Sequence, residues 1–377
     1  MLPDLDVRGR RWPPSEGFTL TLEGVLQHHG RALLGCTSRS VRSTAKVFAI
    51  LLAMYGTEAW AQPDARTATV QPFEIEARIP LGDVRGRIDH MAIDLSRQRL
   101  FVAELENDSV GIVDLKDRKV FRTLTGLKQP QGVGYMASTD TLYVANAGDG
   151  SVRLYQGADY VPAGAIDLGD DADNVRVDQT AGRVVVGYGD GGLAVIDGKT
   201  HNKVADVPLK AHPEGFQLLP STGQVFVNVP KSRAIAVVDL LTRMPIASWQ
   251  MAMAADNFPM AIDQSSAQVL SVFRSPPKLG IFSIGDGRLV TALETCGDAD
   301  DVFVDRKRHR VYVSCGQGFV DVFGSRQGAY ERGGRIATLA GARTSLFSSE
   351  LDRYFVAARA VGARSAAIWV LRPVGDE

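Results

Sequence analysis

The sequence lacks any apolar stretch long enough to cross a bilayer as a helix, and it has almost no net charge. Its clearest apolar run, Val47 to Tyr55, has nine residues, whereas a membrane-spanning helix needs about 20. Lys and Arg total 42 against 43 Asp and Glu, which gives a formal net charge of −1. We therefore expect no membrane span and no nucleic-acid partner, because neither an anionic lipid surface nor a nucleic acid would be strongly attracted.

Common catalytic signatures are missing too. From residue 72 onward the sequence contains no G-x-S-x-G elbow, no H-E-x-x-H pair and no P-loop. It also has no C-x-x-C-H motif, which covalent haem attachment would require. Local motifs thus leave the chemistry of the protein open.

What the sequence does contain is a repeated hairpin. In LYVANAGDGSVRLY, residues 142–155, two strand-favouring segments flank an Ala-Gly-Asp-Gly turn. Similar hairpins recur at spacings of 42, 42, 41, 44, 42 and 43 residues, within the range for four-stranded propeller blades. The seven hairpins begin at Leu100, Leu142, Val184, Val225, Val269, Val311 and Tyr354.

Each repeat adds a strand before the hairpin, such as residues 91–94, and one after it, such as residues 120–124. Asp-Gly pairs at 149–150, 190–191, 197–198 and 286–287 supply the positive φ angles that tight turns need. The sequence therefore predicts an all-β fold, a seven-bladed β-propeller with four-stranded antiparallel blades. We expect it to span residues 72–373 and to be a monomer.

The seventh repeat lacks its fourth strand, because only Arg-Pro-Val-Gly-Asp-Glu follows the strand at residues 367–371. Residues 73–81, ahead of the first repeat, have the character of an outer strand. We expect this N-terminal strand to pair with residues 367–371 and close the ring, which would leave no long open edge at the seam.

The segment Leu142-Tyr143-Val144-Ala145-Asn146 resembles the Tyr-Val-Thr-Asn repeat of the YVTN family of bacterial seven-bladed propellers, with Ala in place of Thr. The resemblance covers about residues 72 to 373 and implies a secreted or periplasmic propeller without naming a ligand. No Trp-Asp dipeptide occurs, and the four Trp residues do not follow the repeat, so WD40 and tryptophan-docked quinoprotein propellers are disfavoured.

The N-terminal region has the features of an export signal. Arg39, Arg42 and Lys46 precede the apolar run, and Ala59-Trp60-Ala61 offers a small-x-small cleavage site. We therefore expect residues 1–61 to be an extension plus a signal peptide cleaved after about Ala61, and residues 62–71 to be a linker. The protein is then periplasmic or secreted.

Cysteine usage is low and agrees with export. The sequence has three Cys, and loss of the signal segment removes Cys36. Cys296 and Cys315 remain, both expected near one opening of the ring. They form either a disulfide, as is common outside the cytoplasm, or two separate thiols.

The residues that begin the first strand of each blade form a polar ring around one opening of the channel. They are the candidate ligand-binding residues, joined by an arginine that enters the first blade: Arg87, Asp89, His90, Gln131, Asn174, Glu214, Asn257, Asp300 and Asp301. We expect the protein to act as a binding scaffold there, for a small polar ligand or a partner protein, without a cofactor. The same residue types also serve simply to turn the chain and satisfy backbone donors.

A hydrolase is the alternative function. Oxygen ligands from four consecutive blades could hold a divalent cation such as calcium, and His90 or His212 could move a proton while the metal polarises a lactone or ester carbonyl. These ligands resemble the Glu, Asn and Asp set of gluconolactonase-type propellers. The candidate metal residues are Asn174, Glu214, Asn257 and Asp301.

Overall fold

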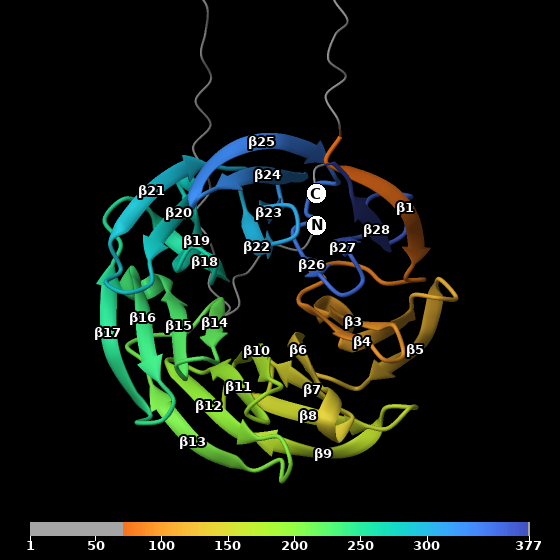
Figure 1. The fold of residues 1–377 in the computed structure, drawn as a ribbon. Helices are drawn as coiled ribbons and strands as arrows, with labels where there is room; N and C mark the ends of the chain where they lie inside the picture. The colour runs from red at the N-terminus through yellow and green to blue at the C-terminus, as the bar shows by residue number, and fades with distance from the viewer. Residues whose placement is uncertain (1–70, 376–377) are drawn as a thin grey trace, which may run out of the picture. The chain divides into compact units, whose positions relative to one another are not determined.

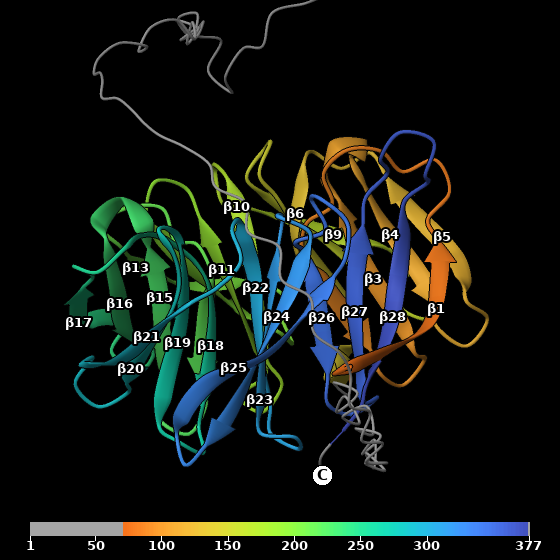
Figure 2. The same cartoon turned by 90° about the horizontal axis from the view of Figure 1, so that it is seen from above.

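The computed structural model describes residues 71–375 and folds them into a ring of seven four-stranded antiparallel sheets around a central channel (Figure 1). Seen at right angles to this view, the strands run between the two faces of the ring (Figure 2). The predicted seven-bladed propeller is thus confirmed. The expected signal segment, its cleavage site, Cys36 and linker residues 62–70 lie outside the described residues.

The strands of each blade run in order from the channel to the outside. The first, innermost strands are β2 (Met91–Asp94), β6 (Pro130–Met136), β10 (Ala172–Asp178), β14 (Phe216–Leu219), β18 (Ala255–Asp263), β22 (Ala299–Asp305) and β26 (Ser345–Ser348). The second strands are β3 (Arg99–Glu104), β7 (Thr141–Asn146), β11 (Arg183–Tyr188), β15 (Gln224–Val229), β19 (Gln268–Ser275), β23 (Arg310–Cys315) and β27 (Arg353–Ala358).

The remaining strands complete the sheets. The third strands are β4 (Ser109–Asp114), β8 (Ser151–Gln156), β12 (Gly192–Asp197), β16 (Ala234–Asp239), β20 (Pro277–Ser283), β24 (Phe319–Arg326) and β28 (Ala367–Pro373). The outer strands are β5 (Lys119–Thr125), β9 (Val161–Asp167), β13 (Lys203–Pro208), β17 (Met244–Gln250), β21 (Leu289–Glu294), β25 (Ala329–Ala337) and β1 (Phe73–Pro80). Three short 3₁₀ turns, η1 (Leu105–Asn107), η2 (Ala137–Thr139) and η3 (Pro230–Ser232), link second to third strands or first to second strands. Among residues 71–375, no helix has the length and apolar character that a membrane span requires.

The outer strand of the seventh blade comes from the start of the described chain. β1 pairs antiparallel with β28, from Phe73 opposite Pro373 to Pro80 opposite Ala367. The backbone N–H of Leu81 then donates to the carbonyl of Ala366 at 3.0 Å. This is the predicted closure, and it leaves the seventh blade with four strands like the others.

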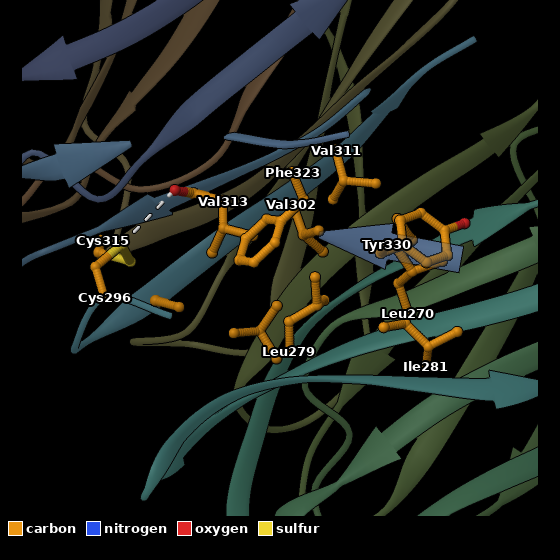
Figure 3. Packing of buried hydrophobic residues seen from close by; sticks show 13 residues of the cluster. Leu270, Leu279, Ile281, Cys296, Val302, Val311, Val313, Cys315, Phe323 and Tyr330 are labelled. Carbon is orange, nitrogen blue, oxygen red and sulfur yellow. Dashed lines mark hydrogen bonds between the residues drawn. A yellow bond between two sulfur atoms is a disulfide. The ribbon is translucent and has the colours of Figure 1, made fainter. Parts of the chain in front are cut away.

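The hydrophobic core is divided among the seven interfaces between neighbouring blades. Second strands such as β7 are buried along their whole length, whereas outer strands such as β9 are mostly exposed. Between the fifth and sixth blades, Leu270 and Leu279 pack toward Val302 and Val313 (Figure 3). Close packing of β-branched and aromatic side chains on both faces of each sheet fixes the spacing of the blades.

One of these interfaces contains a disulfide. Cys296, in the segment that enters the sixth blade, is bonded to Cys315 at the end of β23, with a Cα–Cα distance of 5.8 Å (Figure 3). Both residues are buried in the same cluster as Val313. The bond ties the entry to the first strand of this blade to the end of its second strand, close to the channel opening.

The far face of the ring, opposite to where the first strands begin, is fixed by repeated ionic contacts. Four first strands end in an Asp whose carboxylate accepts backbone N–H bonds from the following turn: Asp94, Asp178, Asp263 and Asp305. Two of these turns also send an arginine to the next blade, and each forms two hydrogen bonds with a carboxylate there: Arg97 with Asp140, and Arg308 with Asp352.

Ring closure predicts that truncating two isoleucines of β1 to alanine lowers the free energy of unfolding by different amounts. Ile79 is 1% exposed and shares a cluster with Leu100 and Ile368 across the seam, so Ile79→Ala should lower the free energy of unfolding by about 2–5 kcal/mol. Ile75, on the same strand, is 48% exposed, so Ile75→Ala should cost less than about 0.5 kcal/mol. Urea denaturation of the full chain measures both, and equal losses would contradict the closure.

The disulfide predicts a thiol count and a stability change. In a Cys36→Ser chain unfolded in guanidinium, no thiol should react before reduction and two should react afterward. Reduction should lower the free energy of unfolding by about 3 kcal/mol, as expected for a loop closed over 19 residues. The same reductant should leave the double variant Cys296→Ala, Cys315→Ala unchanged. Two reactive thiols without reduction would rule out the bond.

Candidate functional site

The first strands begin around one end of the channel, and a cavity of about 390 Å³ opens there. We call it the mouth cavity. Because consecutive blades present equivalent positions to the channel, residues far apart in sequence meet in this ring. Eight of the nine candidate ligand-binding residues line the mouth cavity: Arg87, Asp89, His90, Gln131, Asn174, Glu214, Asp300 and Asp301.

Asn257, the ninth candidate, lies in a different place. Its side chain is fully buried, and its Nδ2 donates to Asn228 Oδ1 at 2.8 Å and to the Ala234 carbonyl at 3.0 Å. Ser271 donates to the same Asn228 oxygen at 2.9 Å. Asn257 therefore belongs to a polar network between the fourth and fifth blades and is not among the residues that line the mouth cavity.

The candidate metal residues are separated by this placement. Asn174, Glu214 and Asp301 line the mouth cavity, but the Asn257 amide is held by Asn228. Within residues 71–375, no three or more His, Cys, Asp or Glu side chains are grouped as metal ligands would be. No observation here favours the hydrolase.

Of the lysine and arginine side chains at the mouth, the sequence analysis named only Arg87 among the candidate ligand-binding residues. Five lysine and arginine side chains line the cavity: Arg87, Arg176, Lys231, Arg274 and Arg343. Arg176 lies two residues beyond Asn174 on β10, so the two-residue alternation of a strand could have identified it. The other three lie away from the starts of the first strands. Lys231 lies in η3, Arg274 at the end of β19, and Arg343 on the segment before β26. The repeat does not predict how far such side chains extend.

Asp300 is held between two arginines. Arg274 Nη2 lies 2.5 Å from Asp300 Oδ1, and Arg343 Nε lies 3.0 Å from Asp300 Oδ2. The Arg274 guanidinium also lies 3.7 Å from the centre of the Phe258 ring, and Arg343 contacts Asp298 at 2.8 Å. Burial raises the pKa of Asp300 even though both arginines act to lower it. These contacts fix the side of the mouth formed by the fifth to seventh blades.

A second ionic group lies on the first blade. Asp89 Oδ2 is 2.5 Å from Arg87 Nη2, and Asp89 Oδ1 is 2.9 Å from His90 Nδ1. Burial alone would raise the pKa of Asp89, but the hydrogen bond and charge of His90, together with Arg87, lower it to about 2. Burial acts to lower the pKa of His90, yet the bond to Asp89 and the nearby carboxylates raise it to about 9. His90 is therefore a cation at neutral pH.

The third and fourth blades contribute His212 and Glu214. His212 Nδ1 donates to the Gly189 carbonyl at 2.6 Å, and its Nε2 lies 3.7 Å from Asp173 Oδ2. Burial opposes protonation of His212, but Asp173 and the Gly189 carbonyl raise its pKa to about 9. Burial, with the Asp173 charge added, raises the pKa of Glu214 to about 8. This side of the mouth thus combines the His212 cation with Glu214, an acid that is costly to ionise.

Three groups at the mouth lack the partners that buried polar groups normally have. Asp173 and Asn174 are only 5% and 2% exposed, and the Oδ1 atom of each accepts no hydrogen bond. Buried polar atoms normally have such a partner. Arg176 donates to the Val175 carbonyl at 2.9 Å but forms no ion pair with a carboxylate of residues 71–375. Burial lowers the pKa of Arg176. The mouth therefore offers buried acceptor oxygens without donors and a guanidinium without a carboxylate partner.

The mouth cavity continues into the channel. A second cavity of about 260 Å³ lies along the first strands and shares several residues with the mouth cavity. We call these shared residues the floor of the mouth: His90, Arg176, Gln217, Asp301 and Phe303. Burial raises the pKa of Asp301 to about 7, against the opposing charge of His90, and its Oδ2 accepts the Ser345 N–H at 2.7 Å. The floor of the mouth therefore carries two basic side chains, His90 and Arg176, beside one acid, Asp301.

Comparisons with known proteins bear on the fold. No family model matches the sequence, and no curated protein matches it. A solved structure of Kuenenia stuttgartiensis hydrazine synthase is similar, with a TM-score of 0.67 and 15% identity over 82% of this chain and 99% of that one. A chain in a mitotic checkpoint complex gives a TM-score of 0.68 and 11% identity over 88% and 99%. At these identities the likeness concerns the fold alone, and it agrees with a seven-bladed β-propeller.

Proposed function

We propose that this protein is an exported scaffold of the YVTN type that binds a small polar ligand in the mouth cavity. The observation that carries the proposal is the cavity of about 390 Å³ with unpartnered buried oxygens on Asp173 and Asn174. Buried acceptors without partners are rare in folded proteins, because each one loses its hydrogen bonds to water. A bound ligand that donates hydrogen bonds would supply them.

The size and lining of the cavity favour a small ligand over a partner protein. Pockets for small molecules typically measure about 300–1,000 Å³, and the mouth cavity lies at the lower end of this range. Its charged side chains come from six blades, counting Arg87 on the first and Arg343 on the seventh. Ion pairs of Asp89 and Asp300 with their basic neighbours hold part of this lining in place before binding, which reduces the ordering cost of binding.

Export is supported by separate features. The disulfide between Cys296 and Cys315 is of a kind that persists in oxidising compartments such as the periplasm. The basic residues, apolar run and Ala59-Trp60-Ala61 of the N-terminal region have the order of a secretory signal. The YVTN-like segment at residues 142–146 agrees with this location.

Ligand binding at the mouth predicts a ligand-dependent rise in Tm. We would screen the full chain against neutral sugars, primary amines, carboxylates and amino acids at increasing concentration. A ligand present at ten times its Kd should stabilise the fold by about 1.4 kcal/mol, or roughly 2–4 °C in Tm. At least one class should give this rise.

Two tryptophan variants locate the effect. Gln131→Trp places a large ring in the mouth cavity and should abolish the rise. Lys199→Trp, in the turn between β12 and β13 on the far face, should retain it. If no class raises Tm, or if both variants respond like the unaltered chain, the proposed function is wrong.

A further inference from the structure

We infer that the ligand is an amino-carboxylate zwitterion, bound with its ammonium group against Asp173, Asn174 and Glu214 and its carboxylate against Arg176. This inference rests on the proposed function and names the chemical class of the ligand. We call the first three residues the acceptor cluster. They come from β10 and from the segment that precedes β14, on adjacent blades.

Two buried oxygens of the acceptor cluster receive no hydrogen bond from residues 71–375. Asp173 Oδ2 faces His212 at 3.7 Å, while Asp173 Oδ1 and Asn174 Oδ1 are buried without partners. The Glu214 carboxylate forms no hydrogen bond or ion pair with residues 71–375, and the nearby charge of Asp173 opposes its ionisation. A cationic donor placed among these oxygens would donate to Asp173 and Asn174 and would stabilise the ionised form of Glu214.

A protonated amine fits this set of acceptors well. An ammonium group carries three N–H donors and no acceptor, and the cluster offers three acceptor side chains. Calcium, by comparison, takes six to eight oxygen ligands. The amide of Asn174 contributes one of the three contacts, so the cluster is not simply a group of acids that repel one another.

The opposite charge is found at the floor of the mouth. Arg176 lies two residues from Asn174 on the same strand and lines both the mouth cavity and the cavity below it. Its guanidinium has no carboxylate partner among residues 71–375, although Asp301 and Asp173 act on it through space. His90 adds a second positive group at this level. Arg176 is half-buried, donates one hydrogen bond to the Val175 carbonyl and lies 5.5 Å from the centre of the Phe216 ring. Its guanidinium still has donors to spare for an anion, and a carboxylate accepts a planar pair of such donors well.

Two other acids at the mouth, Asp89 and Asp300, already have basic partners. Asp89 contacts Arg87 and His90, and Asp300 contacts Arg274 and Arg343. Asp301 at the floor accepts the Ser345 N–H, and burial raises its pKa to about 7. The acceptor cluster is then the main site for a ligand cation, and Arg176 is the main site for a ligand anion. The acceptor cluster favours a cation, and Arg176 favours an anion. A ligand with both charges therefore fits the site better than an amine or an acid alone.

Isothermal titration calorimetry of the full chain tests this directly. The probes are glycine, β-alanine and γ-aminobutyrate, compared with butylamine and butyrate, which each carry one of the two charges. At least one amino-carboxylate should bind about tenfold or more tightly than both single-charge probes, because each charge-assisted contact contributes about this much. The comparison uses the unaltered protein, so it does not depend on any variant folding.

Two variants separate the two ends of the ligand. Glu214→Gln should lower the affinity for the amino-carboxylate and for butylamine about tenfold or more, with little effect on the affinity for butyrate. Arg176→Met should lower the affinity for the amino-carboxylate and for butyrate by a similar factor and leave the affinity for butylamine unchanged. Lys199→Gln, a charge change on the far face, should leave all affinities unchanged. Circular dichroism and Tm confirm that each variant is folded.

The outcomes distinguish the inference from the proposed function. If a sugar, an amine or an acid binds at the mouth and no amino-carboxylate binds more tightly, the zwitterion is wrong and the binding function stands. If amino-carboxylates bind but both variants leave their affinities unchanged, the assignment of the two ends is wrong. If no probe of the Tm screen binds, the proposed function itself falls.

Discussion

The pairing of β1 with β28 is the contact on which the rest of this structure depends. It gives the seventh blade its fourth strand, and two residues of β1 join the clusters that pack this blade on its neighbours, Ile79 toward the first blade and Phe73 toward the sixth. The seam also passes through the mouth, where Thr344 donates to the Ile88 carbonyl at 2.9 Å across 256 residues of sequence. Arg343 and Asp89, which flank this bond, are thereby brought to opposite sides of the same junction. At this junction the first and seventh blades complete the polar ring.

The mouth is held together by burying charges in opposite pairs. Asp89 and Asp300 each contact two basic side chains, which offsets much of the cost of removing carboxylates from water. Two regions are left outside this pairing, the oxygens of Asp173 and Asn174 and the guanidinium of Arg176. The paired groups give the cavity its shape, and the unpaired ones give it a chemical preference. Stability and binding are thus divided between different side chains of one ring.

Much of this architecture could be predicted from the sequence, because a period of about 42 residues fixes both the number of blades and the positions that face the channel. The same register placed eight of nine candidate residues at the mouth cavity. It failed for Asn257 because the amide of this residue turns to the neighbouring blade, where it donates to Asn228 and to the Ala234 carbonyl. It also missed Arg274, at the end of β19, and Arg343, on the segment before β26, because these long side chains reach the mouth from positions that do not begin a first strand. Repetition predicts backbone positions, whereas these side chains depend on local departures from it.

The central claim is that burial among opposite charges, and not exposure to solvent, governs the ionisable groups at the mouth. NMR titration of the histidine rings in the labelled full chain measures this most directly, with His90→Gln and His212→Gln used to assign the signals. The account predicts that both rings titrate with a pKa of about 9, because Asp89 and Asp173 stabilise the imidazolium forms. Titration of both near the ordinary value of about 6.5 would contradict it.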